Sequence, residues 1–500
     1  MLTSLSLPPF NFYLINFLTF TLFFIFLIKK SIIHKNIKLF FFYGWLFGFG
    51  YFITNLYWIS ISLTFDQSFK FLIPLTIFLI PAFLGIFYGI VTFFFIILKS
   101  KKIVSSFLVF SLIFGVMEFI RGSILTGFPW NLIAYSFSNH LEILSITTII
   151  GTYGFNLFCI SLFTCPALII LKNKRKNVGV VILFFICFLF FHIYGFFYQK
   201  EFNSSDKKSY DYKVRVIGSN ISLDRFYSSV DPISVIRDLI KISNPDRNDK
   251  TIFVWPEGIL PNITQNELIE YDWLFNKNFN ENHLLIIGLN SQSTKNRIGP
   301  PDYFNSFSVF DNKLNLLNSY DKNNLVPFGE FLPFEKILKG IGLRSITNNY
   351  HSFSKGYERD IIKISRQNFT LKILPLICYE IIYSGKLFDD SDFDLIINIS
   401  EDGWFGKSIG PKQHFVHSIF RAIESGKYIV RSANNGVAAI INPLGTVEQK
   451  VDFGKSGYID FKESKKMQTT MFSTYGNKTF GLLILLFIFL IYSFNRINDE

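Results

Sequence analysis

A carboxylate, an amine and a thiol occur in the second half of the chain, each just after a short apolar segment, at Glu257, Lys322 and Cys378. An ordinary thiol is mostly protonated at neutral pH, and its thiolate is the reactive nucleophile. A nearby carboxylate can take the thiol proton, while an ammonium group can stabilise the oxyanion of a tetrahedral intermediate. Together, the three side chains would suit the covalent transfer of an acyl group through a thioester.

Each of these residues also has an ordinary structural explanation. Cys378 could be a small buried core residue, Glu257 a solvated turn residue and Lys322 a surface lysine. His414 and His417, on one predicted helix, offer a weaker alternative in which a histidine is the base for Cys378. The clustered ligand spacing of a metal site does not occur, so we expect no metal and no cofactor.

The segments before the three residues predict strands that end close together. Residues 251–255, 314–320 and 371–377 have the length and composition of strands. In an open α/β sheet, ligands gather at the carboxyl ends of the strands, so the three groups could converge there, with the backbone N–H of Tyr379 as a second oxyanion donor. An α/β layered domain over residues 201–478 is also indicated by predicted strands at 213–218, 284–290, 304–310, 394–399 and 437–442 and by predicted helices at 231–243, 264–277 and 412–426.

The first 200 residues and the last 20 carry the apolar excess of the chain. Overall, 50% of the residues are hydrophobic and 17% are charged, whereas a soluble globular protein has about 25% charged residues. Each apolar segment approaches or exceeds the ~20 residues that cross the hydrocarbon core of a bilayer. We therefore expect a multi-span α-helical membrane bundle over residues 1–200 and a last transmembrane helix. The predicted spans are 10–28, 37–60, 71–98, 103–125, 140–171 and 178–199, followed by 479–494.

Positive charge alternates along the connections between these spans. The connections 29–38, 99–102 and 172–177 are rich in lysine, whereas the intervening ones carry little or no positive charge. Because cytoplasmic loops are enriched in lysine and arginine, we expect the N-terminus and residues 201–478 outside the cytoplasm and a cytoplasmic tail at 495–500. Most of the net charge of +12 lies in these connections, so we expect no nucleic-acid partner.

Cys378 is the only cysteine between residues 201 and 478, the part of the chain expected outside. In a bacterium this compartment is the periplasm or the cell exterior, and it is oxidising. An unpaired thiol there is a candidate reactive group. We expect a multi-pass protein of the bacterial inner membrane with its catalytic domain on the periplasmic side.

Short motifs around these residues resemble the Glu–Lys–Cys site of the nitrilase superfamily and, more narrowly, the apolipoprotein N-acyltransferase family. The resemblance covers nearly the whole chain, including the membrane segments on both sides. Its specificity comes from the motifs together and not from any single one. The motifs are VWPE at 254–257, YDK at 320–322, LVPFGEFLP at 325–333, ICYE at 377–380, NISEDGWFG at 398–406, GPKQH at 410–414, RAIE at 421–424 and RSANNG at 431–436.

The resemblance implies an αββα four-layer sandwich, with Glu257 as general base, Lys322 as oxyanion stabiliser and Cys378 as nucleophile. It implies an acyltransferase for the last step of lipoprotein maturation. Such an enzyme would move a fatty acyl chain from a membrane phospholipid, through a Cys378 thioester, to the α-amino group of the diacylglyceryl-cysteine of an apolipoprotein. Supporting positions are implied at Glu330, Tyr379 and Glu380.

The chain departs from this family in two places. We expect seven spans where the family usually has eight, and Tyr227 stands where the family often has a tryptophan. Aromatic residues that flank the motifs could line an acyl entry or could simply pack in the core. These residues are Phe328, Phe331, Phe334, Trp404 and Phe405.

Two other functions remain possible from the residues alone. A membrane-anchored amidase would use the same three groups on a small amide, with water as the acceptor, although a single span would anchor it. A non-catalytic membrane scaffold would not need Glu257, Lys322 and Cys378 to be intact. Seven spans favour a lipid substrate, and we expect a monomer.

Overall fold

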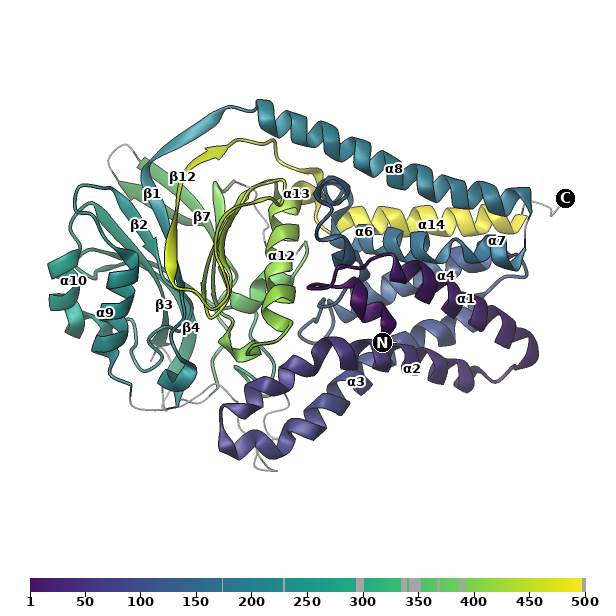
Figure 1. The fold of residues 1–500 in the computed structure, drawn as a ribbon, viewed down its shortest axis with the longest axis horizontal. Helices are drawn as coiled ribbons and strands as arrows, with labels where there is room; N and C mark the ends of the chain where they lie inside the picture. Colours follow the sequence, from purple (N-terminus) through teal and green to yellow (C-terminus); the bar gives the residue numbers. More distant parts are fainter. Residues whose placement is uncertain are drawn as a thin grey trace.

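The protein, a computed structural model, consists of a helical bundle and a domain built on a β-sheet, which lie end to end (Figure 1). Residues before 205 and the C-terminal helix form the bundle, and the residues between them form the sheet domain. The structure describes residues 1–172, 174–227, 230–293, 301–333, 340, 352–366, 369–385, 387 and 392–496.

Seven helical segments in the described part of the chain are long and apolar enough to cross a membrane. They are α1 (Ile15–Ile33), α2 with the 3₁₀ helix η2 (Ile37–Leu56 and Tyr57–Thr64), η3 with α3 (Gln67–Leu72 and Ile73–Leu98), α4 (Ile103–Arg121), α6 with α7 (Thr147–Thr164 and Ala167–Leu171), α8 (Arg175–Ser204) and α14 (Lys478–Arg496). Short helices lie outside these segments: η1 (Leu2–Ser6), η4 (Ile133–Phe137) and α5 (Leu141–Leu144).

The N-terminus lies near the sheet domain, and the last helix runs away from that domain to the far end of the bundle (Figure 1). Two of the lysine-rich connections lie at this far end. The Oγ of Ser100 donates a 2.6 Å hydrogen bond to Oδ1 of Asn495, and the ammonium of Lys176 lies 5.4 Å from the ring centre of Phe494. These two lysine-rich connections and the sheet domain are therefore on opposite sides of the bundle.

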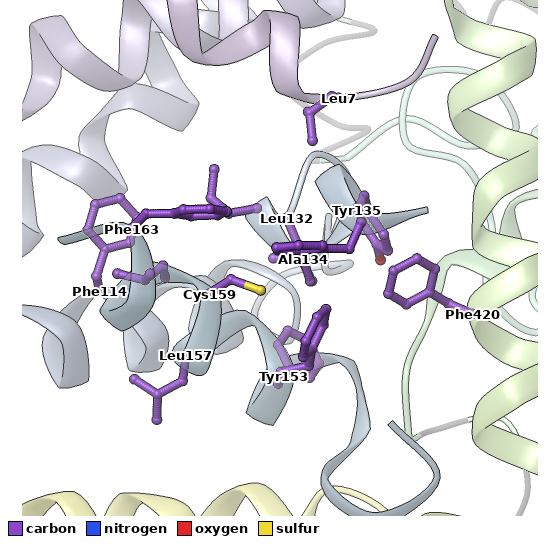
Figure 2. Packing of buried hydrophobic residues seen from close by; sticks show 14 of the residues in the cluster. Leu7, Phe114, Leu132, Ala134, Tyr135, Tyr153, Leu157, Cys159, Phe163 and Phe420 are labelled. Carbon is purple, nitrogen blue, oxygen red and sulfur yellow. The ribbon is translucent and has the colours of Figure 1, made fainter. Parts of the chain in front are cut away.

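Aromatic side chains fill the core of the bundle and continue it into the sheet domain. Tyr135 of η4 faces Phe420 of α12 (Gly410–Ser425), with ring centres 4.8 Å apart and nearly perpendicular rings (Figure 2). The same hydrophobic cluster includes Phe20 of α1 and Phe163 of α6. Because this cluster is continuous, α12 packs on the bundle and is shielded from solvent.

Gln413 on α12 joins the bundle to the sheet domain by hydrogen bonds. Its Oε1 accepts from Nε1 of Trp130 at 2.9 Å and from Nε1 of Trp58 at 3.3 Å, while its Nε2 donates to the carbonyl oxygen of Pro8 at 3.3 Å. Buried indole N–H groups need acceptors, because an unsatisfied donor costs free energy. The Gln413 amide supplies the acceptor for two tryptophans that come from different parts of the bundle.

A break inside α6 lets the end of the sheet domain dock on the bundle. Gly151 has a φ of 66°, a left-handed conformation that glycine adopts without a steric penalty. A Cβ at this position would lie 2.1 Å from Cε2 of Phe472 in α13 (Met471–Tyr475). Glycine is therefore needed where the segment just before the last membrane helix packs on α6.

The sheet is narrow at its centre. Its path through the described strands is β5-β4-β3-β2-β1-β9-β8-β7-β6. Beside this path, β12 pairs with β1, β10 pairs with β9, and β11 pairs with β10. The two halves meet where Gly218 and Ser219 of β1 pair with Ala433 and Asn434 of β9, at the carboxyl ends of both strands. The strands are β1 (Lys207–Ser219), β2 (Thr251–Val254), β3 (His283–Ser293), β4 (Asp302–Asp311), β5 (Leu316–Asp321), β6 (Ile362–Arg366), β7 (Phe369–Ile377), β8 (Leu395–Glu401), β9 (Tyr428–Asn434), β10 (Ala438–Ile441), β11 (Val447–Val451) and β12 (Gly457–Lys465).

The two halves of the sheet face each other across a shared hydrophobic layer. Val216 and Ile286 from one half and Ile397 and Val430 from the other belong to this layer. The helices α9 (Pro232–Ser243) and α10 (Asp272–Asn278) cover the outer face of one half, and α12 covers the outer face of the other (Figure 1). The result is the αββα four-layer sandwich expected from the resemblance, with its last layer buried against the bundle.

The sequence predicts eight of these strands and misses β6, β9, β11 and β12. The most informative omission is β9, which is fully buried although Arg431, Ser432 and Asn434 give it a polar sequence. The predicted helix at 264–277 begins too early. Thr264 forms a β-bridge with Asn290, the 3₁₀ helix η6 (Glu267–Tyr271) follows, and the α-helix begins at Asp272.

Candidate active site

The carboxyl ends of β2, β5 and β7 bring Glu257, Lys322 and Cys378 together. The Nζ of Lys322 lies 3.0 Å from Oε1 of Glu257, and the exposed fractions of the three residues are 6%, 1% and 7% in the order named. The charges of Glu257 and Lys322 both act on the thiol of Cys378. A carboxylate, an ammonium group and a thiol therefore share one buried site.

Lys322 and Asn305 each bridge two carboxylates. The Nζ of Lys322 donates to Oε1 of Glu257 and to Oε1 of Glu330, both at 3.0 Å. The Nδ2 of Asn305, on β4, donates to the same two oxygens at 2.8 Å. An ammonium group has three N–H donors, so one donor of Lys322 remains for an oxyanion on a substrate.

The charge of Lys322 is stabilised by these carboxylates. Burial by itself would lower the pKa of the Lys322 ammonium, but Glu257 and Glu330 outweigh it and raise the pKa well above its usual value. Lys322 therefore stays protonated and acts through its positive charge. This property fits the oxyanion stabiliser that the sequence predicts.

Glu257 is oriented from its other side by the end of β8. The backbone N–H of Glu401 donates a 2.9 Å hydrogen bond to Oε2 of Glu257. The side chain of Glu401 is itself bound by Arg225 and by Nδ2 of Asn434, the latter at 2.7 Å. Both oxygens of Glu257 are thus held, so the carboxylate is positioned for proton transfer before a substrate arrives.

Cys378 sits in a strained turn. Its φ is 48°, a left-handed conformation that costs a non-glycine residue on the order of 1–3 kcal/mol. The turn continues as the 3₁₀ helix η7 (Cys378–Ile382), where Oε2 of Glu380 accepts the N–H of Ile377 at 2.9 Å. The N–H of Tyr379 belongs to the first turn of this helix, where N–H groups lack intrahelical acceptors, and it can therefore donate to an oxyanion.

The other carboxylate oxygen of Glu380 binds further groups that stabilise this turn. Oε1 of Glu380 accepts from the hydroxyl of Tyr320 at 2.6 Å and from the backbone N–H groups of Asn323 and Asn324 at 3.2 and 3.1 Å. The guanidinium of Arg359 lies 2.7 Å from the same oxygen. Glu380 is completely buried, and these partners compensate its charge. It acts as the anchor of the turn that carries Cys378.

The thiol of Cys378 is protonated at rest. Burial raises the pKa of the Cys378 thiol well above its usual value, and the charges of Glu257 and Asp402 raise it further. Lys322 and a hydrogen bond with Ser400 act in the opposite direction. Formation of the thiolate therefore needs a base, which agrees with the placement of Glu257.

Cys378, Asp402 and His414 offer atoms of the kinds that bind metals, all within 4.8 Å of one another. Arg431, however, donates to both oxygens of Asp402, at 3.0 and 2.9 Å, and its Nη2 lies 3.1 Å from Nδ1 of His414. A cation at this point would meet the permanent charge of the guanidinium. The arrangement is that of a buried ion pair.

Two of the predicted aromatic residues lie between the sheet domain and the bundle. The ring of Trp404 packs against Tyr227 and against Phe65 of the bundle, with ring centres 6.3 and 6.0 Å apart. Phe405 packs against Trp58 with ring centres 4.8 Å apart. The loop that follows Asp402 therefore contacts the connection between α2 and α3.

Phe328 and Phe331 lie in the turn that carries Glu330. Phe328 has 49% of its surface exposed, and its N–H donates to the carbonyl oxygen of Phe331 at 2.7 Å. Phe331 is half-buried. Phe334 lies outside the described residues.

Sequence reasoning assigned no role to Asn305, Arg359, Ser400, Asp402 or Arg431, which all contact the site or its supports. Ser400, Asp402 and Arg431 belong to motifs that carry the family resemblance, and they are polar residues in or next to strands. That pattern could have identified them. Arg359 lies far along the chain from Glu380 in a segment without regular structure, and no local pattern indicates it.

Comparison with known proteins gives two family matches along the chain. Residues 1–165 match the model described as apolipoprotein N-acyltransferase N-terminal domain, and residues 242–461 match carbon-nitrogen hydrolase. A protein of Rhizobium leguminosarum bv. trifolii named apolipoprotein N-acyltransferase is 32% identical over 91% of this chain and 87% of its own length. A Rhizobium etli protein of the same name is 31% identical over the same shares. Among solved structures, an amidase from Nesterenkonia sp. AN1 is 12% identical with a TM-score of 0.34, covering 51% of this chain and 92% of that one.

Proposed function

Because the chain belongs to the apolipoprotein N-acyltransferase family, we propose that it transfers a fatty acyl chain from a membrane phospholipid to the N-terminal amino group of an apolipoprotein. The observation that carries this proposal is the buried cluster of Glu257, Lys322 and Cys378 in a domain joined to a membrane bundle. A carbon-nitrogen hydrolase domain alone would equally suit an amidase. The match of residues 1–165 to the N-terminal domain of the acyltransferases favours a lipid substrate.

In the first half-reaction, a carboxylate oxygen of Glu257 takes the proton of the Cys378 thiol. The thiolate then attacks the ester carbonyl carbon of the phospholipid, and the resulting oxyanion is stabilised by Lys322 and the N–H of Tyr379. The ester C–O bond breaks, and the lysophospholipid oxygen leaves with the proton held by Glu257. The products are a lysophospholipid and a fatty acyl thioester on Cys378.

In the second half-reaction, the α-amino group of the diacylglyceryl-cysteine attacks the thioester carbon. Glu257 takes a proton from the attacking nitrogen, the C–S bond breaks, and the Cys378 thiolate recovers its proton from Glu257. An amide is more stable than a thioester, so this step is downhill. Since both substrates are lipids, their confinement to the bilayer surface raises their effective concentration at the site.

The bundle lies in the bacterial inner membrane with the sheet domain on the periplasmic side. This orientation is supported by the lysine-rich connections, two of which lie at the end of the bundle away from the sheet domain. Cytoplasmic loops are enriched in lysine and arginine. Every group named in the mechanism comes from a single chain, which fits a monomer.

The thioester is the decisive intermediate. After incubation of the purified full-length protein with phospholipid and no apolipoprotein, we expect a fatty acyl mass on the peptide that contains Cys378, and hydroxylamine should release it. The Cys378→Ala variant should show no such adduct and no acyl transfer. A matched control is Cys187→Ala, which removes a half-buried thiol in α8 and should leave the adduct in place. Acyl transfer by Cys378→Ala at the parent rate would disprove the covalent mechanism.

A further inference from the structure

The sulfur of Cys378 has a second set of polar neighbours besides Glu257 and Lys322. The Oγ of Ser400, on β8, lies 3.4 Å from Sγ of Cys378 and 2.7 Å from Oδ1 of Asp402. Asp402 is in turn bound by Arg431 of β9 and His414 of α12. Ser400, Asp402, His414 and Arg431 all have 0% exposed surface.

The charge of Asp402 is compensated inside this group. Burial would raise the pKa of the Asp402 carboxyl, but Arg431 and His414 outweigh burial and hold the pKa well below its usual range. Arg431 reaches both Asp402 oxygens, and Nδ1 of His414 lies 2.8 Å from Oδ1. Burial lowers the pKa of His414, so its imidazole is neutral and donates Nδ1–H to the carboxylate. Asp402 is therefore a permanent, paired anion.

The hydroxyl of Ser400 has one proton and two acceptors within reach. Nη2 of Arg431 donates to Oγ of Ser400 at 3.2 Å, which leaves the hydroxyl proton to point either at Asp402 or at the sulfur of Cys378. When the sulfur is a thiol or a thioester, the carboxylate of Asp402 is the stronger acceptor. When the sulfur becomes a thiolate, a rotation about the Cβ–Oγ bond turns the same proton toward it. The rotation moves no heavy atom.

We propose that Ser400 is a further catalytic residue, which donates its hydroxyl proton in a hydrogen bond to the Cys378 sulfur whenever that sulfur is negatively charged. Asp402 and Arg431 are the positioning residues, because they hold the serine oxygen and accept its hydrogen bond at the other stages. The thiolate is both the attacking group of the first half-reaction and the leaving group of the second, so Ser400 assists both. This inference rests on the proposed function only for the identity of the nucleophile.

The charged groups around the sulfur determine whether a substitution raises or lowers the pKa of Cys378. The sulfur is faced by Glu257 after β2, Lys322 after β5 and Asp402 after β8, with Ser400 beside it. The neutral imidazole of His414, on α12, also lies within 4.8 Å of the sulfur. Glu257 and Asp402 disfavour the thiolate, while Lys322 and Ser400 favour it. Removing Ser400 should therefore raise the pKa of Cys378, and neutralising Asp402 should lower it.

The test measures how fast iodoacetamide alkylates Cys378 in the full-length protein as a function of pH, with the modified peptide identified by mass. A hydrogen bond to a charged group is worth enough to slow alkylation about ten-fold at a given pH in Ser400→Ala and to move the profile upward by about one pH unit. Asp402→Asn, which preserves shape, should move the profile downward. Ser432→Ala removes a buried serine of β9 that bonds to the carbonyl oxygens of Ile217 and Val254, and it should leave the profile unchanged.

Opposite shifts in Ser400→Ala and Asp402→Asn would support the proposal, because a general loosening of the site would move both profiles in the same direction. An unchanged profile in Ser400→Ala, or equal shifts in all three variants, would overturn it. Alkylation does not depend on acyl transfer. If no acyl adduct forms on Cys378 while the opposite shifts persist, the proposed function fails and the role of Ser400 in stabilising the thiolate stands.

Discussion

The hydroxyl of Tyr379 donates a 3.0 Å hydrogen bond to the carbonyl oxygen of Gly127. Tyr379 follows Cys378, the proposed nucleophile, and Gly127 lies in the connection after α4 of the bundle. Arg121, at the end of α4, donates to the carbonyl oxygen of Trp130 at 3.0 Å and so holds the same connection from within the bundle. The bundle thereby holds the side chain of the residue whose N–H is the proposed oxyanion donor.

The variant Tyr379→Phe should show what this contact contributes. It loses one hydrogen bond, so the free energy of unfolding should fall by about 0.5–1.5 kcal/mol. The N–H of Tyr379 loses its side-chain anchor, so formation of the acyl adduct should slow by about 10- to 100-fold. The control is Tyr428→Phe, which removes a hydroxyl bound to Glu448 at the beginning of β9. Equal rates in the two variants would refute a role for the bundle in positioning the turn.

Exchange of Glu257 for glutamine should distinguish the role of Glu257 from that of Glu330, the other carboxylate bound to Lys322. A positioned general base contributes about 10²–10⁴-fold, so Glu257→Gln should slow adduct formation by that factor. Glu330→Gln leaves the base in place and should have a smaller effect. Adduct formation with phospholipid is the measurement, by mass of the Cys378 peptide. A larger loss in Glu330→Gln would reverse the assignment of the base.

The reactivity of Cys378 should rise with pH beyond the range of an ordinary thiol. Burial, Glu257 and Asp402 raise the pKa of Cys378, so the thiolate forms only as the pH rises above the usual value of about 8.5. The alkylation rate of the parent protein should still be increasing well above that pH, where the alkylation rate of an ordinary thiol levels off. A rate that levels off near pH 7 would contradict a protonated resting thiol.

Loss of Arg359 should destabilise the turn that carries Cys378. Arg359→Leu leaves the buried carboxylate of Glu380 without its cation, and breaking a buried ion pair in this way costs about 3–5 kcal/mol. Thermal unfolding should show the loss, together with slower adduct formation. Arg247→Leu is the control, because Arg247 is exposed and its guanidinium donates a hydrogen bond to the carbonyl oxygen of Lys277. Comparable unfolding of the two variants would contradict the anchoring role of Glu380.

The amide of Gln413 should be important for the joining of the two parts of the molecule. Gln413→Leu leaves the indole N–H groups of Trp58 and Trp130 without this acceptor, at a cost of about 1–3 kcal/mol for each buried donor. We expect a lower unfolding temperature, with alkylation of Cys378 largely retained in the folded protein. The neighbouring exposed Lys412 provides the control Lys412→Leu. An unchanged unfolding temperature in Gln413→Leu would show that the hydrophobic contacts alone hold α12 to the bundle.

The sequence predicts the fold well where local composition decides it. Long apolar segments separated by lysines predict helices, and short apolar segments such as that before Cys378 predict strands, because each pattern reflects burial of a whole element. The strand β9 escapes this reasoning, since its buried Arg431 is stable only beside Asp402, which lies in another motif. The environment that makes such a residue acceptable comes from the tertiary structure.

In the candidate site too, some residues can be predicted from local sequence and others cannot. Glu257, Lys322 and Cys378 are indicated by their chemistry and by their positions after predicted strands. Arg359 and Asn305 are not indicated, because their partners are distant along the chain and their own neighbourhoods are ordinary. Ion pairs such as Arg359 with Glu380 are specified by three-dimensional proximity, which a single sequence does not contain.

The helix α12 has two inner faces and no outer one, since Lys412 is the only residue of its sixteen that is exposed. In a water-soluble sandwich, a helix of the outer layer has a solvent-exposed face whose residues can be substituted without disturbing the packing. Each turn of α12 must instead satisfy the sheet and the bundle at once. The catalytic domain and the bundle are therefore not interchangeable modules, and a chimera between relatives would have to exchange α12 and its partners on both sides together.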